Sequence, residues 1–202
     1  MEYLDTYDEN GKFLEARSRE DVHKLGLWHK TIHCWLYDKK GNIYFQIRAE
    51  EQKFYTTASG HVDAGETIKE AFGREIREEI GVEVDQDKAT LVDVVVWTMD
   101  KEKADGSVFK DRVFANVYVS EFNEANNSFS FDLNEVSGLV KVNAKEALEM
   151  FTREIGEIAA EIITPEGVIK RNVKFEEFLV NKHETALGKY GDILNKVISL
   201  LS

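Results

Sequence analysis

The sequence is poor in cysteine, proline and positive charge, and each shortage excludes a class of protein. The lone cysteine, Cys34, leaves no intrachain disulfide and no cysteine-based zinc site, which favours a reducing, cytoplasmic setting. Cys34 lies in an apolar run, 31–37, where core packing is favoured over a role as nucleophile. Lys and Arg number 26 against 38 Asp and Glu, and the net charge of −12 argues against binding to nucleic acid polymers or anionic membranes.

Long apolar runs and linkers are absent too. No stretch approaches the roughly 20 apolar residues that cross a bilayer, and the acidic start of the chain lacks a secretory signal. No proline-rich or Gly/Ser-rich segment divides the 202 residues, of which 43% are hydrophobic. The sequence therefore predicts one folded domain over 1–202.

The order of elements is mixed. A β-hairpin and a short helix are expected over 1–27, followed by strands at 31–37 and 43–47 that predict a second hairpin. Apolar residues at helical spacing predict the clearest helix over 67–80. Further strands are expected at 90–98, 108–120 and 136–142, the first of them so apolar that burial on both faces is predicted.

Two helices are expected nearer the end of the chain. The first carries Ala147, Leu148 and Phe151. The last is amphipathic and places five apolar residues on one stripe: Leu187, Tyr190, Leu194, Val197 and Leu201. That stripe predicts either packing against the body of the protein or a homodimer contact.

Carboxylates concentrate on the helix at 67–80. Glu75, Glu78 and Glu79 stand at i, i+3 and i+4, so all three project from one face. Like charges at this spacing repel one another, and a hard divalent cation with oxygen ligands would relieve the repulsion. The pattern thus predicts a Mg²⁺ or Mn²⁺ site, with a solvated acidic helix face as the alternative.

The surrounding segment resembles the signature of the Nudix hydrolase family. That signature is a glycine, five residues, a glutamate, seven residues, then Arg-Glu-apolar-any-Glu-Glu-any-Gly-apolar. Every specified position is met here, by Gly60, Glu66, Arg74, Glu75, Ile76, Glu78, Glu79, Gly81 and Val82.

The resemblance implies roles for these residues. The Gly60 carbonyl and the carboxylates of Glu75, Glu78 and Glu79 would bind the metal, while Arg74 and Glu66 would hold loop and helix together and orient Glu75. The implied chemistry is attack of water on phosphorus in a diphosphate, with Glu75 or Glu135 accepting the proton of the water. The implied fold is an α/β/α sandwich with a mixed sheet, a core at about 28–155 and a C-terminal helical extension at 156–202.

Residues 3–150 also resemble the Nudix subgroup related to isopentenyl diphosphate isomerase. In that comparison His23, His29 and His61 fall where the isomerase has three histidine metal ligands. The isomerase cysteine is replaced by Ser59, and its acidic pair aligns with Lys110 and Arg112. These changes argue against isomerase activity and against that metal site. His23 and His29 are then expected to hydrogen-bond or pack, and a metal role is the second interpretation.

Substrate contacts are also implied by the subgroup. Arg48 and Lys53 align with diphosphate-contacting positions, and His61 lies beside Gly60. Three aromatic residues near the expected site are candidates either to stack on a nucleobase or to pack: Trp28, Phe54 and Tyr55.

The sequence therefore predicts a metal-dependent hydrolase that cleaves a pyrophosphate linkage in a nucleoside diphosphate derivative or similar small diphosphate. Two alternatives stay open. One is an isomerase-like enzyme. The other is a non-catalytic ligand-binding module, against which the complete set of carboxylates argues.

Overall fold

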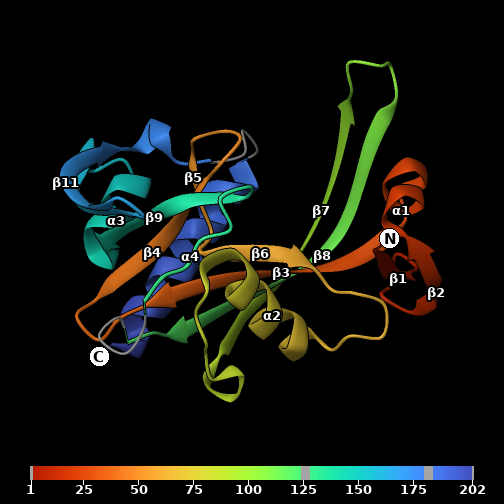
Figure 1. Ribbon diagram of the computed structural model, residues 1–202, viewed down its shortest axis with the longest axis horizontal. Coiled ribbons are helices and arrows are strands. Elements are labelled where there is room, and N and C mark those ends of the chain that lie inside the picture. Colours follow the sequence, from red (N-terminus) through yellow and green to blue (C-terminus); the bar gives the residue numbers. More distant parts are fainter. Residues whose placement is uncertain (1, 124–127, 180–183, 202) are drawn as a thin grey trace.

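The computed structural model describes residues 2–123, 128–179 and 184–201 (Figure 1). The elements follow one another along the chain in this order: β1 (Tyr3–Tyr7), β2 (Phe13–Ser18), α1 (Arg19–Leu25), β3 (Trp28–Tyr37), β4 (Asn42–Arg48), β5 (Phe54–Tyr55), β6 (Ala58–His61), α2 (Ile68–Ile80), η1 (Gln86–Lys88), β7 (Thr90–Glu102), β8 (Val108–Glu121), β9 (Val136–Asn143), α3 (Ala144–Phe151), β10 (Glu157–Thr164), β11 (Gly167–Lys174), η3 (Phe175–Glu177) and α4 (Glu184–Leu200).

The strands form one mixed sheet. Its main path runs β11-β10-β9-β4-β3-β1-β2, with β5 on β4, β6 and β8 on β3, and β7 on β8. The pair β3–β8 is parallel, and the other pairs of named strands are antiparallel. Helix α2 covers one face, and α3 and α4 cover the other (Figure 1). The expected α/β/α sandwich with a mixed sheet and an N-terminal hairpin is thereby confirmed.

Alternation along β3 divides the core between the two faces. Ile32, Cys34 and Leu36 pack toward α2, whereas Trp35 and Tyr37 join the cluster under α3 and α4. From the stripe predicted on the last helix, Tyr190, Leu194 and Val197 are buried in this second cluster and Leu201 packs against it. Leu187 lies outside the side chains that the structure describes. The described residues of the stripe therefore pack against the body of the same chain.

Helix α2 is bounded by strong local signals. The hydroxyl of Thr67 accepts from the backbone N–H of Glu70, and the Glu70 carboxylate accepts from the N–H of Thr67, which forms a capping box. At the other end Gly81 adopts φ 70°, a left-handed conformation that favours glycine. The helix predicted over 67–80 is thus confirmed to within one residue.

Three expectations about strands are wrong in detail. β3 and β4 pair only at Tyr37–Ile43, because β3 continues beside β6 and β8 while β4 pairs with β9. β7 is an edge strand with Val94 and Val96 exposed, not a strand buried on both faces. The C-terminal segment is not only helical, since β10 and β11 extend the sheet before α4 begins.

One glycine lets β9 and β10 approach closely. A Cβ on Gly138 would lie 2.5 Å from the backbone oxygen of Ile163, an atom that cannot rotate away. We expect Gly138→Ala to lower the free energy of unfolding by about 1–3 kcal/mol, as measured by urea denaturation. Gly156→Ala is the matched control, because a Cβ there meets no atom within 4 Å. Equal stability of the two variants would contradict the close approach.

Candidate active site

Helix α2 carries the three carboxylates at different depths. Glu75 and Glu79 are buried, at 9% and 4% exposed, whereas the Glu78 side chain is 60% exposed. Two carboxylates therefore lie between the helix and the sheet, and the third lies at the surface beside them.

The β6 backbone lies against Glu75 at a glycine. A Cβ on Gly60 would fall 2.1 Å from the Glu75 carboxyl group. Since φ of Gly60 is not in the left-handed region, glycine is needed here for the close approach of backbone and carboxylate.

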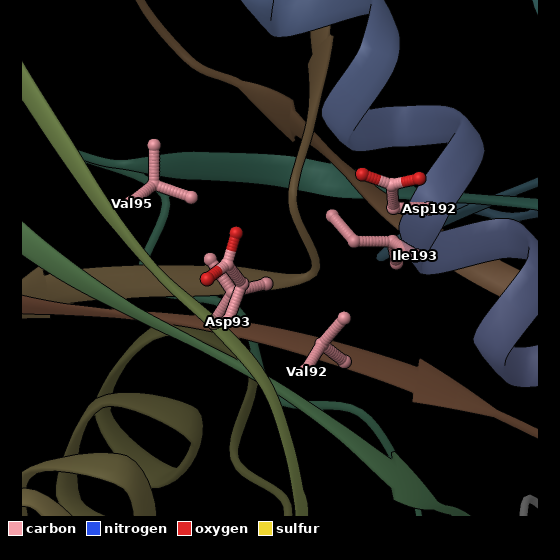
Figure 2. Close-up of a pocket in the computed structure, with 6 residues that line it drawn as sticks. Val92, Asp93, Val95, Asp192 and Ile193 are labelled. Atoms are coloured by element: carbon pink, nitrogen blue, oxygen red, sulfur yellow. The ribbon is translucent and has the colours of Figure 1, made fainter.

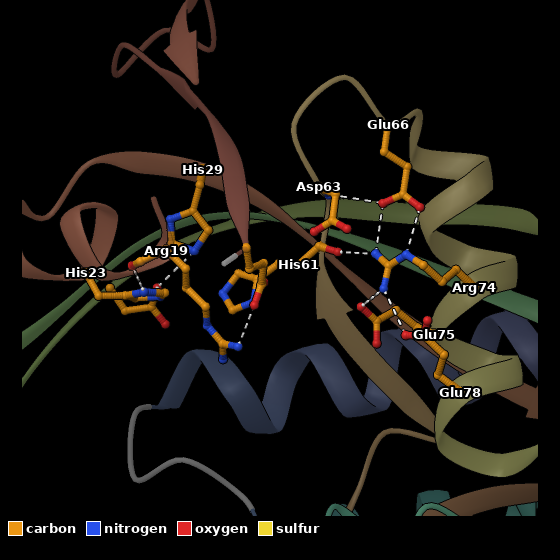
Figure 3. Close-up of polar contacts among 11 residues, drawn as sticks. Arg19, His23, His29, His61, Asp63, Glu66, Arg74, Glu75 and Glu78 are labelled. Carbon is orange, nitrogen blue, oxygen red and sulfur yellow. Dashed lines mark hydrogen bonds and ion pairs between the residues drawn. The ribbon is translucent and has the colours of Figure 1, made fainter. Parts of the chain in front are cut away.

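Arg74 ties the loop before α2 to the carboxylates (Figure 3). Its Nε and Nη2 donate to the two oxygens of Glu66 at 2.9 and 2.8 Å, a bidentate pair. Nη2 also donates to the His61 carbonyl at 2.9 Å, and Nη1 donates to Glu75 at 2.7 Å and to Glu78 at 3.2 Å. The structure thus brings together Glu66, Arg74, Glu75 and Glu78 beside Gly60.

Glu79 is bound from the other side. Its Oε2 accepts from the Ser59 N–H at 3.1 Å and from Gln46 Nε2 at 3.4 Å. Burial raises the pKa of Glu79 well above its usual range, and the charge of Glu75 raises it further. Burial likewise raises the pKa of Glu75 to about 7 against the opposing charge of Arg74.

These carboxylates fit a hard divalent cation. Two of them are buried close together, and burial, with the charges of neighbouring carboxylates, raises the pKa of both. The donor set consists of carboxylate and carbonyl oxygens, which Mg²⁺ and Mn²⁺ prefer. A bound cation at Gly60, Glu75, Glu78 and Glu79 would supply the missing positive charge.

Glu135 lies close enough to affect the same carboxylates. It is exposed in the turn before β9, where its carbonyl accepts from the Ala49 N–H at 2.8 Å. Its charge raises the pKa of Glu75 and Glu79, although burial and other charged groups have larger effects on both. Glu75 and Glu135 therefore both stay candidates for the general base.

The three predicted substrate contacts lie in different surroundings. The Arg48 guanidinium lies 5.7 Å from the centre of the Tyr55 ring, and its charge opposes the burial-driven rise in the pKa of Glu79. Lys53 Nζ instead donates to the Glu176 carbonyl at 2.6 Å. The His61 ring points away from Glu75 and joins two other histidines (Figure 3).

The aromatic candidates also separate. Phe54 is buried against Phe178, with ring centres 5.1 Å apart, so core packing is its role. Trp28 packs on Phe114 at 5.0 Å. Tyr55 is half-buried and meets the ring of His33 edge-on at 5.7 Å, which leaves it the best placed of the three for contact with a ligand.

A second cluster, of three histidines, lies on the opposite side of Figure 3 from Glu66 and Arg74. Ring nitrogens of His23 on α1, His29 on β3 and His61 on β6 lie within 4.8 Å of one another. Asp111 on β8 joins them, with Oδ1 3.4 Å from His29 Nε2 and 3.8 Å from His23 Nε2.

Hydrogen bonds fix which nitrogens face this cluster. His23 Nδ1 lies 2.8 Å from the Arg19 carbonyl, and His29 Nδ1 lies 3.1 Å from the Leu27 carbonyl. A carbonyl only accepts, so each Nδ1 carries a proton and each Nε2 faces the cluster. Burial lowers the pKa of His29 to about 4, so its Nε2 presents a lone pair. His29 Nε2 and Asp111 Oδ1 are buried without a hydrogen-bond partner among the described residues. Such a set of inward acceptors suits a transition metal.

The sequence reasoning missed Asp111 because it considered the residues on either side. The Lys110 side chain packs over Gly26, and Arg112 pairs with Asp100 at 2.6 Å and donates to the Met99 and Asp111 carbonyls. Neither cation enters the histidine cluster. Strand alternation was the available signal, since it turns residue 111 to the face opposite 110 and 112.

Comparison with known proteins decides the family. The NUDIX domain matches residues 27–164. The chain belongs to the Nudix family. It is therefore a Nudix pyrophosphohydrolase by family, and Nudix hydrolases generally use divalent cations such as Mg²⁺ or Mn²⁺.

Relatives extend the match beyond that segment. An uncharacterized Nudix hydrolase of Clostridium acetobutylicum is 30% identical over 200 residues, covering 94% of this chain and 92% of that protein. An isopentenyl-diphosphate Delta-isomerase of Mycolicibacterium vanbaalenii is 27% identical, over 43% of this chain and 51% of its own. The Deinococcus radiodurans protein DR0079 shares the fold, with TM-score 0.52 and 21% identity, over 75% of this chain and 90% of that one.

Among the described residues, no helix is both long and apolar enough to cross a membrane.

Proposed function

We propose that this Nudix protein is a metal-dependent hydrolase that cleaves the pyrophosphate linkage of a nucleoside diphosphate derivative or a similar small diphosphate. The observation that carries the proposal is the pair of buried carboxylates. Glu75 lies against Gly60 and is oriented by Arg74, and Glu79 is bound by the Ser59 N–H.

The residues divide the work as follows. Gly60, Glu75, Glu78 and Glu79 would hold Mg²⁺ or Mn²⁺, which neutralises phosphate charge and activates water when bound. Arg74 orients Glu75 and, through Glu66 and the His61 carbonyl, keeps the β6 backbone against the helix. Glu75, which lies against Gly60 and is oriented by Arg74, is the first candidate to accept the proton of the attacking water. Glu135 is the second candidate for that step, and Arg48 would contact the phosphates.

The test is a substrate panel with Mg²⁺ or Mn²⁺, followed by mass spectrometry. It contains nucleotide sugars, dinucleotides, nucleoside triphosphates and isoprenoid diphosphates. We expect hydrolysis of at least one diphosphate by the wild type and a loss of about 10³-fold or more in the Glu78→Gln, Glu79→Gln double variant. Unchanged activity in the double variant would reject the metal assignment. No product from any compound would favour a binding module.

The histidine cluster supports a second proposal, that His23, His29, His61 and Asp111 hold a transition-metal ion. The supporting observation is the convergence of the three rings and Asp111. His29 Nε2 and Asp111 Oδ1 are buried 3.4 Å apart without a hydrogen bond among the described residues. It also keeps the isomerase alternative in the panel, although Ser59 in place of the cysteine and a single carboxylate, Asp111, in place of an acidic pair argue against it. Rearranged isoprenoid diphosphate without hydrolysis would favour that alternative.

A further inference from the structure

Two pairs of strands meet at the carboxylate of Glu79. β6 pairs with β3, and β5 pairs with β4, while β3 and β4 pair with each other only at Tyr37–Ile43. Ser59 of β6 donates its N–H to Glu79 at 3.1 Å, and Gln46 of β4 donates its Nε2 to the same oxygen at 3.4 Å. A proposed metal ligand therefore bridges the two pairs of strands.

Tyr55 of β5 contacts both pairs of strands beside this carboxylate. It lies directly opposite Gln46 in the β4–β5 pair, so both side chains project from one face, with Cβ atoms about 5 Å apart. The Tyr55 ring also meets the ring of His33 on β3 edge-on at 5.7 Å, and His33 pairs with Ser59. Tyr55 is therefore a neighbour of the groups that bind Glu79 from either side.

Arg48 lies over the same tyrosine ring. Its guanidinium carbon is 5.7 Å from the centre of the Tyr55 ring, and its side chain is 36% exposed. Nε donates to Glu51 at 2.9 Å, whereas neither Nη group has a partner in the part of the chain that the structure describes. A guanidinium with two free NH₂ groups is suited to bind phosphate.

The Tyr55 hydroxyl is a second donor at this place. It makes no hydrogen bond to any residue that the structure describes. Burial raises the pKa of Tyr55 to about 12, and the charges of Asp111 and Glu79 contribute to that rise against the charge of Arg48. The hydroxyl therefore keeps its proton at neutral pH and can donate it to an anionic oxygen.

The pocket under α4 is a different place (Figure 2). It has a volume of about 160 Å³, and all of its lining residues belong to β7, β8 and α4. Its two charged residues, Asp93 and Asp192, are acidic and would repel a phosphate. The donors of Arg48 and Tyr55 suit an anion better than this pocket does.

We propose that Tyr55 is a substrate-binding residue whose hydroxyl donates a hydrogen bond to a phosphate oxygen of the diphosphate, next to Arg48. This inference rests on the proposed function and deepens it. A bound cation would neutralise part of the diphosphate charge from the side of Glu79, while Arg48 and Tyr55 bind oxygens from the side of β4 and β5. Such a bond holds the substrate and the transition state alike, so it lowers KM and leaves kcat unchanged.

Tyr55→Phe tests the contact, because it removes the hydroxyl and keeps the ring. On the best diphosphate substrate of the panel we expect KM to rise about tenfold, which corresponds to about 1.4 kcal/mol, with kcat within about twofold of the wild type. The matched control is Tyr118→Phe, at another half-buried tyrosine, which lies on β8 and packs against Phe72 of α2 at 5.7 Å. It should match the wild type in both constants. An active wild type whose KM is unchanged in Tyr55→Phe would overturn this inference alone.

Calorimetric titration with methylene diphosphonate and Ca²⁺ makes the test independent of turnover. The carbon bridge of this compound resists hydrolysis, and the compound carries no group beyond its two phosphonates. We expect its dissociation constant to rise about tenfold in Tyr55→Phe and to stay unchanged in Tyr118→Phe. Equal affinity in the wild type and Tyr55→Phe, or no binding by the wild type, would overturn the inference. If no compound of the panel were hydrolysed while this loss of affinity was observed, the proposed function would fail and the phosphate contact would stand.

Discussion

Arg74→Gln should strongly destabilise this protein. The substitution removes one guanidinium that binds Glu66, Glu75, Glu78 and a backbone carbonyl. The carboxylates of Glu66 and Glu75, only 14% and 12% exposed, would then lie buried without their cation. Breaking a buried ion pair on one side costs about 3–5 kcal/mol. For a chain of this size we expect a fall in Tm of about 6–20 °C in metal-free buffer, read by differential scanning calorimetry.

Divalent cation should restore part of that loss. Mg²⁺ would compensate Glu75 and Glu78 directly but leave Glu66 unpaired, so recovery is expected to be partial. Activity should fall about 100-fold even with saturating Mg²⁺, because a small misplacement of Glu75 weakens the chemical step. The activity of Arg74→Lys should lie between those of the wild type and Arg74→Gln, because lysine keeps the charge but loses the bidentate geometry.

The control for Arg74 is Arg77→Gln, three residues further along the same helix. Arg77 pairs only with the exposed Glu83 in the described structure, and such surface pairs contribute about 1 kcal/mol or less. Its Tm and activity should therefore remain near those of the wild type. If metal-free Arg74→Gln were as stable as Arg77→Gln, the ion pairs of Arg74 would not stabilise the loop and the helix.

Sequence alone predicted the parts of the site that depend on short-range spacing. Glu75, Glu78 and Glu79 share a helix face because of helical periodicity, and Thr67 and Gly81 mark the ends of that helix. The difference between these carboxylates could not be predicted. Glu79 is buried and Glu78 is exposed because of where β4 and β6 lie against α2, which is a long-range contact.

Strand pairing was the least predictable part of the fold. The turn at Asp38–Asn42 is present, yet its two strands separate after one residue pair, because β8 returns beside β3 and β9 beside β4. Neither partner is adjacent in sequence, so no local signal specifies them. The apolar run of β7 was compatible with a central or an edge strand, and only its position decided between them.

The surroundings of the histidine cluster depend on strand phase, which the sequence alone did not specify. A shift of one residue turns a side chain to the other face of the sheet. Lys110 and Arg112 share one face, and Asp111 presents its carboxylate to His29 on the other. The four residues come from α1, β3, β6 and β8, so only the assembled fold brings them together.

Loss of the proposed transition-metal ion is the second large effect that we expect. Three imidazoles and one carboxylate match the ligands that Zn²⁺ and Co²⁺ take in four-coordinate sites. Purified protein should bind one equivalent of Co²⁺ with the visible absorption of such a site, and Asp111→Asn should lose it. At 100 times the dissociation constant, binding contributes about 2.7 kcal/mol, which corresponds to a rise in Tm of about 5–10 °C.

Two control variants test whether the Co²⁺ site is distinct from the carboxylates of α2 and whether removal of any nearby histidine abolishes the spectrum. Glu78→Gln lies outside the cluster and should retain the Co²⁺ spectrum while losing hydrolysis. His33→Asn removes a histidine of the same strand whose ring contacts Tyr55 instead, and it should retain the spectrum as well. If His33→Asn lost the spectrum, or Asp111→Asn kept it, Co²⁺ would not be bound by His23, His29, His61 and Asp111. A proton shared between His29 Nε2 and Asp111 Oδ1 would then be the explanation for their close approach. The pH dependence of Tm in the wild type, compared with that in Asp111→Asn, would reveal such a proton.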